Sequence, residues 1–145
     1  MPRAIDAAGD DPVERLAAAF RGYCEVIAAH RHAAVLTYRE SKTLGSSGRK
    51  RIKALEVATS EPLRQVIADG CMSGRLAVAD ADLLTYDLLL LAHGWALKHW
   101  YFERTRSFDE YVRGQTALVL SAAVAPRYRR RYQHLLSTDR QGDHA

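Results

Sequence analysis

The segment HGWALKHWYFERT, residues 93–105, carries the strongest structural signal in the sequence. It places two Trp, two His and one Lys inside one of the most apolar parts of the chain. Between Asp80 or Asp82 and about Arg104 no helix breaker occurs except Gly94. The pattern therefore predicts one long helix across this part of the chain.

Two lines of apolar or aromatic side chains run along this predicted helix. One line consists of Tyr86, Leu90, His93, Leu97 and Trp100, and the other of Leu88, Leu91, Trp95, His99 and Phe102. A helix that is apolar on opposite sides cannot lie at the surface of a small monomer with one side in water. It is either central in the core or shared with a partner chain. Because the helix that follows, over about 108–124, is also apolar over most of its girth, the two together predict a homodimer held by a four-helix bundle.

The rest of the chain also reads as helical. Helical patterns cover residues 12–29, 31–44, 47–73 and 107–124. The first begins with a capping box of Asp11 and Glu14 around Pro12, and the last with one of Ser107 and Glu110. No stretch shows the period-two alternation of a strand, so the sequence predicts an all-α fold, a single domain of about five helices.

Pro62 lies inside the longest of these helical patterns. A proline in a helix interior removes one backbone hydrogen bond and crowds the preceding turn. We therefore expect a kink or a break near Glu61.

Length and charge define the organisation of the chain. The 145 residues suffice for one domain, which we expect over residues 11–125, after a flexible lead-in over 1–10 and before a basic, flexible tail over 126–145. That tail carries five Arg against two Asp, which is +3 of the formal net charge of +4. Because duplex-binding proteins cluster Lys and Arg on a folded face, a near-neutral body predicts no direct nucleic-acid binding by this chain alone.

Sequence motifs exclude several classes of function. There is no GxSxG, P-loop, GxGxxG or HExxH pattern, so we expect no catalytic residues, no cofactor and no enzyme activity. His93 and His99 are six residues apart, about 240° around a helix, and cannot bind one metal ion from one face. Cys24 and Cys71 are far apart and form no CxxC, which favours a reduced, cytoplasmic setting. The apolar run over 88–92 is too short to cross a membrane.

Four segments in this order resemble a known family. They are YRESKTL from residue 38, VIADGCMSGRLAVADADLL from residue 66, LLAHGWALKHWYF from residue 90 and SFDEYVRGQTALVLSAAV from residue 107. Together they are similar to the C-terminal ligand-binding and dimerisation domain of TetR/AcrR-type transcriptional regulators, over about residues 10–125. The branch they resemble most is associated with fatty-acid and acyl-CoA metabolism.

The resemblance implies a ligand pocket and a dimer seam. The pocket would be walled by the helices at 31–44, 47–73 and 81–103, with a small hydrophobic ligand inside. Periodicity leaves open which line of the 81–103 helix faces the pocket and which faces the partner. We assign to the pocket Tyr38, Arg39, Lys42, Tyr86, Leu90, His93 and Leu97. We assign to the dimer interface Leu88, Trp95, His99, Phe102, Tyr111, Leu118 and Ala122.

The resemblance also implies a function for the chain. The expected ligand is hydrophobic with an anionic end, such as an acyl-CoA, with Arg39, Lys42 or the Arg49 cluster near its acidic group. Such regulators begin with a DNA-binding domain of about fifty residues, and this sequence starts where that domain would end. We therefore expect a dimeric ligand sensor that takes part in transcriptional regulation only when a DNA-binding domain is supplied. The alternative is an interaction protein without ligand that heterodimerises with full-length regulators.

Overall fold

A computed structural model describes residues 2–40, 43 and 45–138, with the backbone alone for Pro2 and Tyr38. The predicted all-α fold is confirmed, because these residues form eight α-helices, one short 3-10 helix and no β-strand. The helices are α1 (Pro2–Ala7), α2 (Pro12–Ala29), α3 (Arg31–Glu40), α4 (Ser46–Met72), α5 (Ala81–Leu97), α6 (His99–Thr105), α7 (Phe108–Ala123), η1 (Pro126–Tyr128) and α8 (Gln133–Leu136). In the part described, no helix has the length and hydrophobicity that a bilayer crossing needs.

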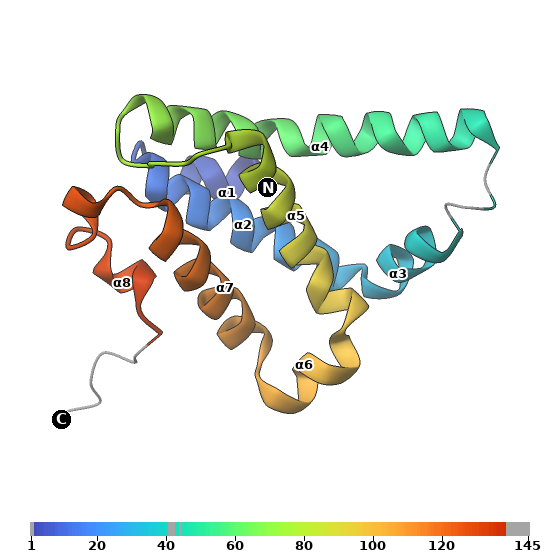
Figure 1. The fold of residues 1–145 in the computed structure, drawn as a ribbon. Helices are drawn as coiled ribbons and strands as arrows, with labels where there is room; N and C mark the ends of the chain where they lie inside the picture. The colour runs from blue at the N-terminus through green and yellow to red at the C-terminus, as the bar shows by residue number, and fades with distance from the viewer. Residues whose placement is uncertain (1, 41–42, 44, 139–145) are drawn as a thin grey trace.

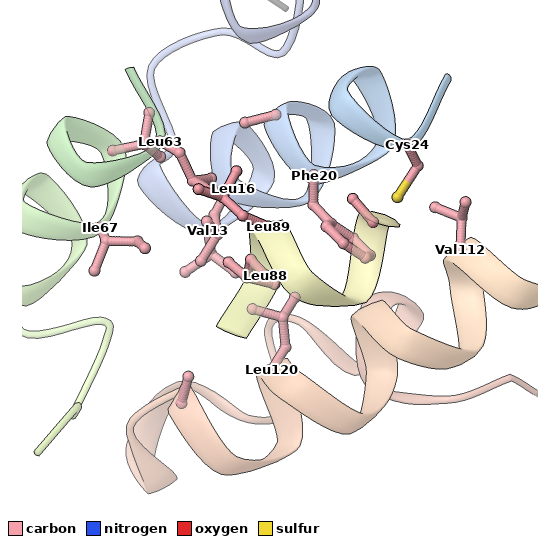
Figure 2. Close-up of a cluster of buried hydrophobic side chains, with 14 of the residues drawn as sticks. Val13, Leu16, Phe20, Cys24, Leu63, Ile67, Leu88, Leu89, Val112 and Leu120 are labelled. Carbon is pink, nitrogen blue, oxygen red and sulfur yellow. The ribbon is translucent and has the colours of Figure 1, made fainter. Parts of the chain in front are cut away.

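Helix α2 is the centre of the core. Its start is fixed by Asp11, whose carboxylate accepts hydrogen bonds from the backbone N–H groups of Val13 and Glu14. From there the apolar side chains of α2 point toward α5, with α4 on one side and α7 on the other (Figure 2). Of the predicted capping box only the Asp11 half forms, because the Glu14 carboxylate instead contacts His134, 2.6 Å away.

Helix α4 is continuous from Ser46 to Met72, so of the kink or break predicted near Glu61 the break does not occur. Pro62 lies inside this helix. The half of α4 after Pro62 packs on the core through Leu63, Val66 and Ile67, and this packing supports the helix where the proline removes a backbone bond. The half before it extends away from the body in Figure 1, with nearly every side chain over residues 46–59 exposed.

The long helix predicted up to Arg104 is wrong, because the chain turns at Lys98 between α5 and α6. Lys98 has φ −118° and ψ 28°, which is outside the helical region. The turn lets Phe102 stack on Trp95, with ring centroids 6.4 Å apart and planes 16° apart, and lets His99 meet the edge of Trp95 at 5.1 Å. Aromatic packing around Trp95 therefore favours two short helices over one long helix.

Helical segments form near both ends of the described part of the chain. The expected flexible lead-in forms α1, with Ile5 buried. Residues 126–136, expected as part of a flexible tail, fold back along α7 onto the start of α2 (Figure 1). Tyr132 at the centre of this segment is 1% exposed and hydrogen-bonds Asp11. Of the predicted tail, 139–145 lies outside the described residues.

Candidate functional site

One side of α5 carries a group of aromatic and polar side chains. The His93 ring meets the Tyr23 ring of α2 edge to face, with centroids 5.6 Å apart. Its Nδ1 lies 2.8 Å from the Leu89 carbonyl oxygen, one helical turn earlier. On the same helix the Tyr86 ring lies 6.0 Å below the Arg64 guanidinium of α4. Half-buried Tyr86 and His93 are thus held between α2 and α4 by ring packing and a cation–π contact.

The structure brings together only part of the predicted pocket. Tyr86 and His93 both lie on this side of α5, and Arg39 is exposed near the end of α3. Leu90 and Leu97 are exposed instead of enclosed. Lys42 and the Tyr38 side chain fall outside the described residues. Tyr23 and Arg64 were missed by sequence reasoning because each fits an ordinary amphipathic helix pattern and no motif singles them out.

A second surface lies where α5 meets α7. It is an apolar groove of about 750 Å³. Its walls are Leu83, Leu84, Asp87, Leu90 and Leu91 of α5, Val119, Ala122 and Ala123 of α7, and the loop residues Ala77 to Asp80. Leu83 and Leu90 are 60% and 58% exposed, and Leu118 on α7 is 71% exposed. Contiguous exposed apolar side chains of this kind are typical of interaction surfaces.

The predicted dimer residues divide between this surface and the interior. Leu118 and Ala122 are exposed on α7, and Ala122 lines the groove. Leu88, Trp95 and Tyr111 are 2%, 7% and 2% exposed, so they belong to the core of one chain and offer nothing to a partner. His99 and Phe102 are half-buried against Trp95. Leu88 and Trp95 are buried in the core, whereas Leu91 of the same line and Leu90 of the other line both border the groove.

An aromatic cluster joins α5, α6 and α7 behind that surface. The Trp95 ring lies 5.6 Å from Phe108 and 5.3 Å from Tyr111. The Tyr111 hydroxyl donates a hydrogen bond to the Leu91 carbonyl, and burial raises the pKa of this phenol above its ordinary value. His99 Nε2 lies 2.8 Å from the Glu103 carboxylate. The cluster fixes the relative positions of the helices that form the apolar surface.

The comparisons with known proteins agree with this architecture. The family model described as Tetracyclin repressor-like, C-terminal domain, matches residues 9–123. The chain belongs to this family. The match confirms, at the level of the family, the resemblance to the C-terminal domain of TetR-type regulators drawn from the four segments.

A curated relative in the TetR family supports the same assignment. It is the HTH-type transcriptional regulator HbdR of Aromatoleum sp. (strain CIB), 39% identical over 112 residues. The aligned region covers 77% of this chain and 48% of the relative, so the chain spans about half the length of that regulator. No solved structure matches the chain.

Proposed function

We propose that this TetR-family domain is a ligand-sensing and dimerisation module that binds a hydrophobic small molecule, with an acyl-CoA as the ligand class. The single observation that carries the proposal is the division of α5 into two unlike sides. One side presents Tyr86 and His93 beside Tyr23 and Arg64, and the side toward α7 presents the apolar groove with Leu84 and Leu91. A sensor that dimerises needs both a partly polar pocket and an apolar seam.

The apolar surface of α5 and α7 supports a homodimer. Each Å² of apolar surface removed from water contributes about 25 cal/mol, and Leu83, Leu90 and Leu118 leave most of their area exposed in one chain. A second copy would cover them by placing its own α5 and α7 against the same helices, which builds a four-helix bundle. TetR-family regulators are generally dimers, which agrees with a second copy of the chain covering this surface.

Sedimentation velocity of matched variants tests the dimer. Leu118→Glu places a charge in the proposed seam and should convert the dimer to monomer. Leu55→Glu makes the same change at a 61% exposed position on the projecting half of α4 and should leave the dimer intact. A monomeric wild-type chain, or equal dissociation of both variants, would contradict the seam.

The polar side chains on the other side of α5 support an acyl-CoA as the ligand. Tyr86 and His93 supply a few polar groups among apolar neighbours, which is how proteins orient a mostly apolar ligand. The start of α4 adds exposed cations, Arg49, Lys50, Arg51 and Lys53, and the end of α3 adds Arg39. Such cations suit the phosphates of coenzyme A, while the side of α5 toward α2 suits the acyl chain.

Native mass spectrometry with acyl-CoAs of increasing length tests the ligand. The expected result is one ligand per subunit, with weaker retention of free coenzyme A and of free fatty acid. Tyr86→Phe and His93→Leu should weaken binding by about tenfold each, as expected for loss of one polar contact. Tyr101→Phe, on exposed α6, is the control. A dimer that retains no ligand would favour the interaction protein that heterodimerises with full-length regulators.

The proposal places the domain in the cytoplasm and assigns it no operator binding of its own. Cys24 and Cys71 are both free thiols, which suits a reducing compartment. Regulation of transcription then depends on a DNA-binding domain joined to this sensor. A gel-shift assay of the chain alone with operator DNA should show no sequence-specific complex.

A further inference from the structure

The basic residues near the C-terminus lie on the folded body instead of on a free tail. Residues 126–136 are held by the Tyr132 hydroxyl, which donates to Asp11, and by the contact of His134 with Glu14. The backbone N–H of Ala125 also donates to the Arg75 carbonyl, 2.8 Å away. The arginines over 127–131 are therefore fixed relative to the loop that holds Arg75.

Two guanidinium groups meet over one aromatic ring in this region. The guanidinium of Arg75 lies 5.6 Å from the Tyr128 ring centroid, and that of Arg127 lies 5.0 Å from the same centroid. The backbone allows this because Gly74 has φ +75°, and a side chain there would meet the Arg127 guanidinium at 2.9 Å. The Tyr128 ring thus contacts guanidinium groups from two distant parts of the sequence.

The surrounding surface is strongly positive. We define the arginine surface as Arg75, Arg127, Arg129, Arg130 and Arg131. Asp11 contacts Arg75 at 3.2 Å and Arg131 at 3.6 Å, and Asp10 is adjacent in the chain. Arg129 donates to the Ser121 carbonyl. Within the described residues no carboxylate lies within ion-pair distance of Arg127, Arg129 or Arg130, and all three residues are exposed.

We infer that the arginine surface is a docking site for an acidic segment of another protein, separate from the ligand pocket and from the α5–α7 surface. Guanidinium groups bind carboxylates in bidentate geometry, and charge-assisted pairs are about twice as strong as neutral hydrogen bonds. A run of Asp and Glu could engage Arg127, Arg129 and Arg130 in succession. A nucleic-acid duplex fits less well, because the Asp11 carboxylate lies among these arginines, 3.2 Å from Arg75 and 3.6 Å from Arg131, and a long line of phosphates would meet it.

Fluorescence anisotropy tests the docking site on the full chain. The probe is a short fluorescein-labelled oligoglutamate peptide at about 50 mM salt, where screening is weak. The double variant Arg127→Gln/Arg130→Gln should bind it about tenfold more weakly, as expected for loss of charge-assisted contacts. The control Lys98→Gln/Arg104→Gln removes the same charge from exposed positions just before and within α6 and should bind within twofold of wild type.

Four outcomes would overturn the docking site. The first is equal weakening in both double variants, which would mean that bulk charge alone attracts the peptide. The second is no measurable binding by the wild-type chain. The third is tighter binding of a random-sequence DNA duplex than of the peptide under the same conditions. The fourth is an unchanged affinity in the single variant Arg130→Gln. Arg130 is exposed and its side chain forms no hydrogen bond or ion pair with another described residue, so its loss should weaken peptide binding without disturbing the fold.

Discussion

The Tyr132 hydroxyl lies 2.9 Å from Oδ1 and 2.7 Å from Oδ2 of Asp11 and donates to this carboxylate. Asp11 also caps α2 and contacts Arg75 in the loop after α4. One carboxylate therefore joins the start of α2, the α4–α5 loop and the C-terminal segment. Burial and the hydrogen bond and charge of Asp11 raise the pKa of Tyr132 to about 12.

Tyr132→Phe should lower the free energy of unfolding by about 1.5–3 kcal/mol, because it removes a buried hydrogen bond to a charged group. Urea denaturation at neutral pH measures the change. Tyr101→Phe, on the exposed face of α6, should change stability by less than about 0.5 kcal/mol. Equal stability of Tyr132→Phe and wild type would show that the C-terminal segment is not held by this bond.

The contribution of Tyr132 should also depend on alkaline pH. Because the pKa of about 12 in the folded chain exceeds the value of about 10 in unfolded chains, the stabilisation is fully present below pH 10 or so and is lost as pH rises through the folded pKa. The difference in stability between wild type and Tyr132→Phe should therefore shrink above that pH. A constant difference up to the alkaline limit of folding would contradict this assignment.

Asp11→Asn tests how much the ionised Asp11 carboxylate stabilises the fold at neutral and at acid pH. Burial opposes ionisation of Asp11, but hydrogen bonds from Tyr132, Glu14 and Val13 and the charge of Arg75 together lower its pKa. Its ionised form thus stabilises the fold above the unfolded pKa of about 4, and this contribution is lost as pH falls through the folded pKa. Since Asn still caps the helix, the variant should lose about 1–3 kcal/mol at neutral pH and approach wild type in acid. Urea titrations across this pH range measure the effect; a pH-independent loss would argue against the charge.

Gly94→Ala should be destabilising although alanine is the better helix former. A Cβ at Gly94 would lie 2.9 Å from the Tyr111 hydroxyl oxygen, and Tyr111 is buried and bonded to Leu91. We expect a loss of about 1–2 kcal/mol from overpacking, and recovery of stability when Tyr111→Phe is added, measured as a thermal double-mutant cycle. Gly114→Ala is the control, because no atom lies within 4 Å of its Cβ position, and it should gain about 0.5–1 kcal/mol. Additive losses in the cycle would disprove the clash.

The two thiols should differ in reactivity. Burial raises the pKa of the Cys24 thiol to about 12, whereas Cys71 is half-buried on α4. At pH 8, Cys71 should react with a thiol reagent at least about ten times faster than Cys24, because the thiolate is the reacting form and access is limited by burial. Peptide mapping after brief alkylation measures the ratio, which should approach one in concentrated urea. Equal rates in the native chain would indicate that α2 opens readily.

Local patterns in the sequence determined most of the helices and the family. The cap at Ser107 is confirmed, with its hydroxyl accepting from the Glu110 backbone N–H at 3.1 Å. Helix period and capping depend on residues three or four positions apart, so they can be read without the fold. Tyr86 and His93 on one side of α5 were also predictable, since both lie in one helical line.

Only the tertiary structure decided which side of α5 is buried, where this helix ends and where the basic segment 126–136 lies. Both lines of α5 are apolar, so burial of Leu88 and Trp95 depends on the position of α2 and α7. The turn at Lys98 depends on aromatic packing around Trp95. The order of residues 126–136 depends on Tyr132 reaching Asp11, 121 positions earlier. These contacts join residues that are distant in the chain, and the local pattern of a sequence does not contain them.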